Sequence, residues 1–252
     1  MNEDLTRNTT PHRPPIHETT ERLAKIIHEG GHTMPEEQPF LVCKPKKIES
    51  WRVFKIMSEF VEGFDIIRRY GLAISFFGSA RALPRDDSYT NAEELAGRLA
   101  KKGFAIITGG SSGIMQAANK GAFDAGGVSV GLNISLPDVQ NYNPYLTEKF
   151  SFDHFFVRKV MLTYASEVYI YFQGGFGTLD EFFEIITLVQ TKKIHRVPII
   201  LFGKDYWEPL LNFIEKTLYE KHATIDKNDM ALYVLVDSVD EAYEYIVANV
   251  SC

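Results

Sequence analysis

The sequence has few cysteines, no long apolar run and no excess of basic residues. Its 252 residues include only Cys43 and Cys252, far apart and without a metal-ligand spacing. A disulfide framework is therefore not expected, and a reducing cytoplasm is the expected compartment. No apolar run approaches the roughly 18–20 residues of a membrane span, and the first residues lack the apolar core of a secretory signal.

The overall charge argues against polyanionic partners. The formal net charge is -6, so the surface as a whole does not attract nucleic acid or an anionic membrane. We therefore expect neither of these partners, although a local basic pocket for a small anion stays open. The 45% hydrophobic and 24% charged content is ordinary for a globular protein with one sizeable core.

The chain divides into a polar start and a longer, regularly patterned part. Residues 1–46 are expected to form a partly disordered N-terminal arm, with a short amphipathic helix at 17–29. Residues 51–70 place apolar side chains at steps of three or four, which predicts an amphipathic helix. Residues 47–252 as a whole are expected to form a single domain.

From residue 72 onward, apolar runs typical of buried parallel strands alternate with helical patterns. Strands are predicted at 72–77, 104–108, 128–133, 168–172, 197–202 and, weakly, 232–236, and helices at 89–102, 112–125, 156–166, 178–191, 205–220 and 238–249. This alternation predicts an α/β fold of the Rossmann-like, doubly wound type, with a mainly parallel sheet and helices on both faces. The helix at 51–70 would be an N-terminal helical extension.

Two glycine-rich turns follow predicted strands: GGSSG at 109–113 and GGFGT at 174–178. Glycines let a ligand approach the backbone closely, and the next helix offers free N–H groups and its positive dipole end. A third turn, FGSARA at 77–82, adds Ser79 and Arg81 to the same sheet edge. Either glycine turn alone is equally well explained as a tight connection, but together the three favour a phosphate or nucleotide pocket. Neither fits a P-loop or a dinucleotide fingerprint.

Two charged groups beside these turns are candidates for chemistry. Thr178 and Glu181 have the spacing of a capping box, with Thr178 as the N-cap. Glu181 either only caps its helix or projects into the pocket to handle water or a developing cation, and the spacing leaves both open. Arg158 and Lys159 begin a predicted helix, where their charges oppose the dipole. That favours an anionic partner, with an exposed, solvated pair as the alternative.

Other residues have weaker cases. GGSSG also fits G-x-S-x-G with Ser111 as nucleophile, but the late histidines His195 and His222 stand in no recognisable context, so a small polar turn that lines an anion site is favoured. His154 is interpreted as a core histidine bonded to the backbone. The aromatic run Phe150, Phe152, Phe155 and Phe156 is interpreted as core. No cluster of His, Cys and carboxylates predicts a metal.

The combination of motifs resembles the LONELY GUY family of nucleoside 5′-monophosphate phosphoribohydrolases, long misnamed lysine decarboxylases. The matching segments are GGFGTLDE at 174–181 against PGGxGTxxE, GGSSGIMQAANKGA at 109–122 against GGxxGxM…A…GA, FGSAR at 77–81, and Arg158-Lys159 as the Arg-Lys pair. The resemblance covers roughly residues 70–220. Gln173 stands where the motif usually has proline, and Met161 comes one place earlier than usual.

The resemblance implies hydrolysis of the N-glycosidic bond of AMP or a cytokinin riboside monophosphate, without a metal or organic cofactor. Glu181 would handle water or the ribosyl cation, and Arg158 would hold and polarise the substrate. The residues implied to bind substrate are Ser79, Gly110, Gly113, Met115, Lys159, Gly174, Gly175, Gly177 and Thr178. A homodimer or higher homo-oligomer is also implied.

Two other functions stay open at this stage. One is a non-catalytic carrier of a nucleotide or of the molybdenum cofactor, which has a similar fold. The other is amino-acid decarboxylation, which is the weaker alternative because no lysine stands in a recognisable pyridoxal-phosphate context.

Overall fold

The computed structural model describes residues 50–135 and 142–250. These residues all belong to one compact unit, Glu49–Cys252. The predicted arm at 1–46, its helix at 17–29 and both cysteines lie outside the described residues, so the predicted domain boundary stays a prediction. Within the described part of the chain, no helix is long and apolar enough to cross a membrane.

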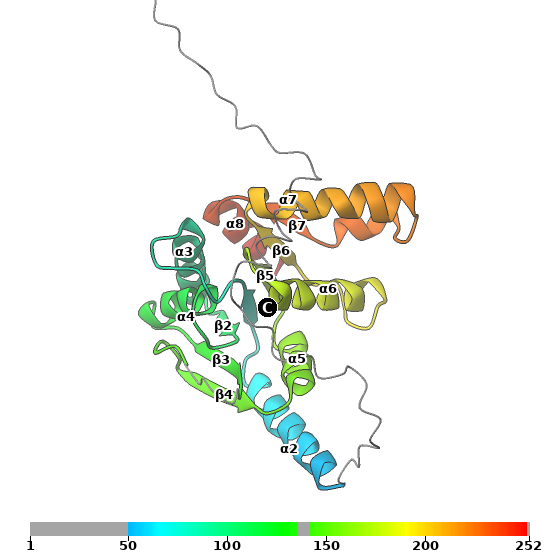
Figure 1. The fold of residues 1–252 in the computed structure, drawn as a ribbon. Helices are drawn as coiled ribbons and strands as arrows, with labels where there is room; N and C mark the ends of the chain where they lie inside the picture. Colours follow the sequence, from blue (N-terminus) through cyan, green and yellow to red (C-terminus); the bar gives the residue numbers. More distant parts are fainter. Residues whose placement is uncertain (1–49, 136–141, 251–252) are drawn as a thin grey trace, which may run out of the picture. The chain divides into compact units, whose positions relative to one another are not determined.

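In the described residues, parallel strands form one seven-stranded sheet in the order β4-β3-β2-β1-β5-β6-β7 (Figure 1). The strands are β1 (Ala73–Phe77), β2 (Ala105–Thr108), β3 (Ser129–Ile134), β4 (Glu148–Phe152), β5 (Val168–Tyr171), β6 (Ile199–Phe202) and β7 (Val234–Val236). Every residue of β1, β2, β3, β5 and β6 is buried, which explains their near-continuous apolar sequences. The predicted α/β fold with a parallel sheet is confirmed.

β4 (Glu148–Phe152) is the strand that the sequence analysis did not predict. It pairs only with β3, at the edge of the sheet, and of its residues only Phe152 is buried. An edge strand is solvated along one side, so its sequence, EKFSF, carries no continuous apolar run. Phe150 and Phe152 lie on this strand, with their ring centroids 4.5 Å apart.

Helices cover both faces of the sheet (Figure 1). α3 (Asp87–Lys101), α4 (Ile114–Asp124) and α8 (Val239–Asn249) pack on one face; α2 (Ser50–Ile67), α5 (Phe155–Tyr164), α6 (Phe176–Gln190) and α7 (Lys204–Phe213) pack on the other. The helix predicted at 205–220 is α7 continued by a π-helical segment, Ile214–Lys221. A short 3₁₀ helix follows at Lys227–Ala231.

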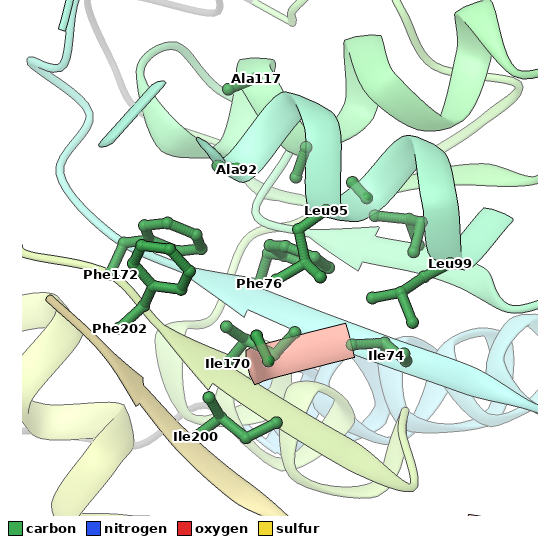
Figure 2. Close-up of a cluster of buried hydrophobic side chains, with 14 of the residues drawn as sticks. Ile74, Phe76, Ala92, Leu95, Leu99, Ala117, Ile170, Phe172, Ile200 and Phe202 are labelled. Carbon is green, nitrogen blue, oxygen red and sulfur yellow. The ribbon is translucent and has the colours of Figure 1, made fainter. Parts of the chain in front are cut away.

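The core under α3 shows how these layers are held together. Leu95 and Leu99 of α3 lie over Ile74 and Phe76 of β1, next to Ile170 of β5 (Figure 2). All five side chains are fully buried. Each such side chain contributes about 1.5–3 kcal/mol of transfer free energy, so this layer fixes β1 and β5 against each other, and with them the loops at their ends.

The chain reverses its path across the sheet between β1 and β5. From β1 it winds outward through β2, β3 and β4, then returns to β5, which pairs with the other side of β1. At such a switch point the loops that follow the two strands diverge and leave a crevice at their carboxyl ends. The loops concerned are those that begin at residues 78 and 172, and they carry the FGSAR and GGFGT motifs.

Candidate active site

A cavity of about 1050 Å³ lies at this switch point. It has the size of a small-molecule site. The amide of Ser79 donates a hydrogen bond to the carbonyl oxygen of Gln173 at 2.9 Å, which joins the two loops that form its walls. Of the residues implied to act on substrate, those that line it are Glu181, Arg158, Ser79, Met115, Lys159, Gly174, Gly175, Gly177 and Thr178.

The start of α6 gives the cavity a wall of backbone N–H groups without partners in the part of the chain that the structure describes. The helix begins at Phe176, with Gly175 as its N-cap. Within the described residues, the N–H groups of Gly175, Phe176 and Gly177 have no hydrogen-bond partner, and all three residues are exposed. A side chain at Gly174 would collide with the Thr178 hydroxyl group, so the turn requires glycine there. Free N–H groups at the positive end of a helix dipole suit a phosphate.

The predicted capping box at Thr178 and Glu181 is wrong. Because α6 starts at Phe176, Thr178 is its third residue and Glu181 lies in the second turn. The N-cap is Gly175, and no side chain caps the helix. Glycine is acceptable as an N-cap, but in a glycine-rich turn it gives no clear signal of where the helix begins. The interpretation of Glu181 as only a helix cap therefore fails.

Glu181 is a buried acid in the cavity wall. Only 8% of its surface is exposed, and the burial raises the pKa of its carboxyl group to about 7, although Lys159 attracts the ionised form. Glu184 adds to the rise, and Arg158 opposes it. A carboxyl group with a pKa close to neutrality is suited to accept or donate a proton at physiological pH.

Arg158 reaches the cavity from α5 across the end of β3. Its Nε donates a hydrogen bond to the carbonyl oxygen of Leu132 at 2.8 Å. Its guanidinium group passes so close to Gly109 that a Cβ there would collide with it. Burial lowers the pKa of Arg158, and the nearby Glu181 carboxylate opposes that effect. An arginine stays charged under such conditions, so it presents a cation beside Glu181.

Lys159 faces three carboxylates of α6. Its Nζ lies 2.7 Å from Asp180 Oδ2 and 3.5 Å from Glu181 Oε2, and it also pairs with Glu184 Oε2. Burial acts to lower the pKa of Lys159, but the hydrogen bonds to Asp180 and Glu184 raise it overall. The ammonium group is therefore charged and already has anionic partners.

Gly110 and Gly113 are not brought to the cavity. From their segment, only Gly109 and Met115 line it. β1 lies between β2 and β5 in the sheet, so the glycine turn after β2 is set back from the one after β5.

Packing explains why the turn after β2 needs these glycines. Gly110 and Gly113 both have φ near +70°, which favours glycine. The Gly110 amide is already bonded to Thr108 Oγ1 at 2.9 Å, and a side chain at Gly113 would collide with the carbonyl oxygen of Ser79. The geometry of this turn supports its interpretation as a tight connection between β2 and α4, not as a ligand-binding loop.

The structure gives no support to a serine hydrolase. Ser111 does not line the cavity, and His195 and His222 are both exposed. Among the described residues, no hydrogen bond joins Ser111 to a histidine. The G-x-S-x-G match is a coincidence of the glycine turn.

His154 is bonded to a side chain, not to the backbone as predicted. Its Nδ1 lies 3.0 Å from Glu59 Oε1, and its own backbone N–H donates to Glu59 Oε2 at 3.2 Å. Since His154 is the N-cap of α5, Glu59 ties α2 to the start of α5. A Cβ at Gly63 of α2 would meet Met161 Sδ of α5 at 2.6 Å, so the two helices also pack closely. The N-terminal extension thus helps to hold the helix that carries Arg158.

Several cavity residues were not among those predicted to bind substrate. Arg81 lines the cavity and forms no ion pair among the described residues. Tyr206 of α7 also lines it, and a tyrosine on a later helix gives no sequence signal of this position. Phe155 and Phe156, interpreted as core, are 62% and 49% exposed and line the cavity together with Phe176, which is 94% exposed. FGSAR already placed Arg81 at this edge, and its charge was the signal available.

Comparisons with known proteins agree with the motifs at this site. A family model described as "Possible lysine decarboxylase" matches residues 115–246, just over half of the chain. A probable cytokinin riboside 5′-monophosphate phosphoribohydrolase of rice (Oryza sativa subsp. japonica) is 33% identical over 133 residues. The chain belongs to the LONELY GUY family. The match to the rice protein covers 51% of this chain and 53% of that protein, so the chain spans about half the length of this relative.

Two further comparisons place the chain within its fold and family. A cytokinin riboside 5′-monophosphate phosphoribohydrolase of Rhodococcoides fascians is 29% identical over 150 residues, which cover 57% of this chain and 75% of that protein. The solved structure of the molybdenum cofactor carrier protein of Chlamydomonas reinhardtii matches with a TM-score of 0.54 and 21% identity, over 70% of this chain and 96% of that one. The second likeness shows the fold alone.

Proposed function

We propose that this LONELY GUY family member hydrolyses the N-glycosidic bond of a nucleoside 5′-monophosphate to free base and ribose 5-phosphate. One observation carries the proposal: the buried carboxylate of Glu181 and the free N–H groups at the start of α6 line the same cavity. An anion site next to an acid with a raised pKa is the arrangement that this reaction needs. The names of the relatives from rice and Rhodococcoides fascians support the same reaction.

The phosphate of the substrate would be held at the start of α6. The free N–H groups of residues 175–177 and the hydroxyl group of Thr178 are its ligands in this proposal, with Arg81 as a counter-ion from the facing loop. The phosphate lies at the far end of the ribose from the bond that breaks. Its binding energy can therefore hold C1′ in position beside Glu181.

The chemistry would take place between Glu181 and Arg158. As the C1′–N bond breaks, its electron pair leaves with the base, which takes up a proton, and positive charge develops on the ribose. The Glu181 carboxylate stabilises this charge and accepts a proton from the water whose oxygen bonds to C1′. Glu181 then releases this proton to solvent, which supplies the proton that the base takes up, so the carboxylate is regenerated and the reaction consumes one water. Arg158 holds the substrate by hydrogen bonds and, as a nearby cation, favours the ionised form of Glu181.

The base would lie against the aromatic mouth of the cavity. Phe155, Phe156 and Phe176 are exposed there, and aromatic rings offer a large apolar surface on which a flat base can stack. We propose an adenine-type base, AMP or a cytokinin riboside monophosphate, because the names of the relatives specify the latter.

The test is base release by the purified protein. AMP, GMP, CMP and isopentenyladenosine monophosphate are incubated separately with the protein, and free base is measured by chromatography. We expect release from at least one purine nucleotide, and a loss of about 10²–10⁴-fold in Glu181→Gln, the range for a lost acid–base group, with AMP binding retained in calorimetry. A folded protein that binds nucleotide and releases no base from any of the four would contradict the proposal and favour a carrier.

A homo-oligomer belongs to the proposal as well. The outward face of α2 exposes Trp51, Phe54, Met57 and Val61, each by more than half of its surface. An apolar face of this kind marks an interaction site more often than a solvated surface, and we propose it as the contact between two copies in a cytoplasmic homodimer. Light scattering of the wild-type protein and of Phe54→Glu tests this, since the variant should be monomeric.

A further inference from the structure

The wall that joins α5 to α6 is the most densely charged part of the cavity. Glu184 lies four positions after Asp180 and three after Glu181, so its side chain neighbours both of theirs on the surface of α6, and all three carboxylates meet the ammonium group of Lys159. The side chains of Lys159, Glu184 and Glu181 are 27%, 24% and 11% exposed. Ion pairs this sheltered from water interact more strongly than pairs on an open surface.

This arrangement makes Lys159 a poor ligand for a phosphate. An ammonium group has three N–H donors, and three carboxylates compete for them here. The carboxylates of Asp180 and Glu184 already outweigh the single positive charge of Lys159, whether or not Glu181 is ionised, and the resulting net negative charge repels a phosphate group. The N–H groups at the start of α6 and the side chain of Arg81 have no such carboxylate partners among the described residues.

We propose that Lys159 is a positioning residue. Its ammonium group fixes the orientation of the Glu181 carboxylate and favours its ionised form, whereas Glu184 favours the neutral form. The proposal rests on the proposed function only in taking Glu181 as the catalytic carboxylate. The Nζ of Lys159 lies 2.7 Å from Asp180 Oδ2 and also pairs with Glu184 Oε2. These two contacts hold the ammonium group in place, 3.5 Å from Glu181 Oε2.

The other charged and titratable groups around Glu181 set the background for this effect. α5 contributes Arg158 in addition to Lys159, α6 contributes Asp180 and Glu184, and β5 contributes Tyr169 and Tyr171. Tyr206 of α7 lines the same cavity. Lys159 and Arg158 favour the carboxylate, and Glu184 and Asp180 favour the neutral acid. Removing Lys159 should therefore make Glu181 harder to ionise, and removing Glu184 should make it easier.

The experiment compares Lys159→Gln, Glu184→Gln and the double variant with a control, Lys216→Gln, whose lysine pairs with Glu220 on an exposed surface. Carboxyl ¹³C NMR of glutamate-labelled protein follows the ionisation of Glu181 directly, with its signal assigned by its absence in Glu181→Gln. The pH profile of kcat/KM for base release from AMP follows the same ionisation in catalysis.

We expect the midpoint pH of Glu181 ionisation to rise by about one unit in Lys159→Gln and to fall by about one unit in Glu184→Gln. The midpoint of the double variant should lie between these two, and that of the control should not change. Unchanged midpoints in both single variants would overturn the proposal, even if the enzyme releases base. Opposite NMR shifts in a protein that releases no base from any nucleotide would support the positioning role and overturn the proposed function. Should Lys159→Gln fail to fold, an unchanged midpoint in Glu184→Gln would by itself overturn the proposal.

Discussion

The hydroxyl group of Tyr206 donates a hydrogen bond to the carbonyl oxygen of Gly174 at 2.6 Å. This contact ties α7 to the glycine turn that precedes α6. The hydrogen bond holds the carbonyl group of Gly174 toward Tyr206, a residue that lies outside the GGFGT motif. It therefore helps to keep the N–H groups that follow Gly174 in the cavity wall. A residue that is 32 positions away in the sequence thus supports the proposed anion site.

Tyr206→Phe should weaken nucleotide binding while the fold stays intact. The change removes one hydrogen bond, whose loss costs about 0.5–1.5 kcal/mol, so KM for AMP should rise about 2- to 10-fold with a smaller change in kcat. Steady-state kinetics measure this. Tyr245→Phe on α8, on the other face of the sheet, is the control, and an equal effect of the two substitutions would count against the role of Tyr206.

Arg81→Ala should lower kcat/KM for nucleoside monophosphates, because their phosphate group would lose a cationic partner. Arg81 lines the cavity and forms no ion pair within the described residues, so its charge is available to the ligand. A hydrogen bond to a charged group contributes about 1.5–3 kcal/mol, which corresponds to a loss of roughly 10- to 150-fold. Arg85→Ala, at an exposed arginine of the same loop that does not line the cavity, should change little. The idea fails if both substitutions have the same effect, or if adenosine binding falls as much as AMP binding.

The central strands of the fold could be predicted from the sequence, because a strand that is buried on both faces has a near-continuous apolar sequence. The same physics explains the omission of β4, an edge strand whose one solvated side breaks up the run. The start of α6 was placed at Thr178 because a threonine with a glutamate three residues later is a strong capping signal, whereas Gly175, the real N-cap, gives no clear signal of the helix start.

The residues that line the cavity could be predicted only in part, because the sequence pattern does not reveal the order of the strands in the sheet. The two glycine turns look equivalent, but β1 lies between β2 and β5. The cavity therefore forms between the turns after β1 and β5, which leaves Gly110 and Gly113 outside it. The role proposed for Lys159 depends on a contact between two helices, α5 and α6, and no spacing within either helix reveals that contact.

Asn119→Ala should destabilise the protein and indirectly loosen the turn after β2. The Asn119 side chain is fully buried and bonded to Thr108 Oγ1 at 2.6 Å, to Ser129 Oγ at 2.8 Å and to Asn143 Nδ2 at 2.9 Å. Its removal leaves buried polar groups without partners, which costs about 1–3 kcal/mol for each group. We expect the free energy of unfolding in urea to fall by about 2–4 kcal/mol, with little change in Asn212→Ala, at an exposed residue of α7. A change of less than 1 kcal/mol would mean that the network is not needed.

Glu181→Gln should stabilise the protein at alkaline pH and leave it unchanged at acid pH. Burial raises the pKa of Glu181 from 4.5 to about 7 in the folded state, so the folded protein binds this proton more tightly than the unfolded chain. The resulting stability is fully present below pH 4.5 and is lost as the pH rises through 7, because the buried carboxyl group must then ionise. Glutamine resembles the neutral acid and has no such loss. The free energy of unfolding of Glu181→Gln should therefore exceed that of the wild type by up to about 3 kcal/mol at pH 8, and should match it at pH 4, as measured by urea unfolding at both values. Glu220→Gln, at a largely exposed carboxylate, should show no comparable dependence on pH. A Glu181→Gln variant that is less stable than the wild type at pH 8 would show that Glu181 is held as a carboxylate by its cationic neighbours, and would remove the basis for a carboxyl group that titrates near neutrality.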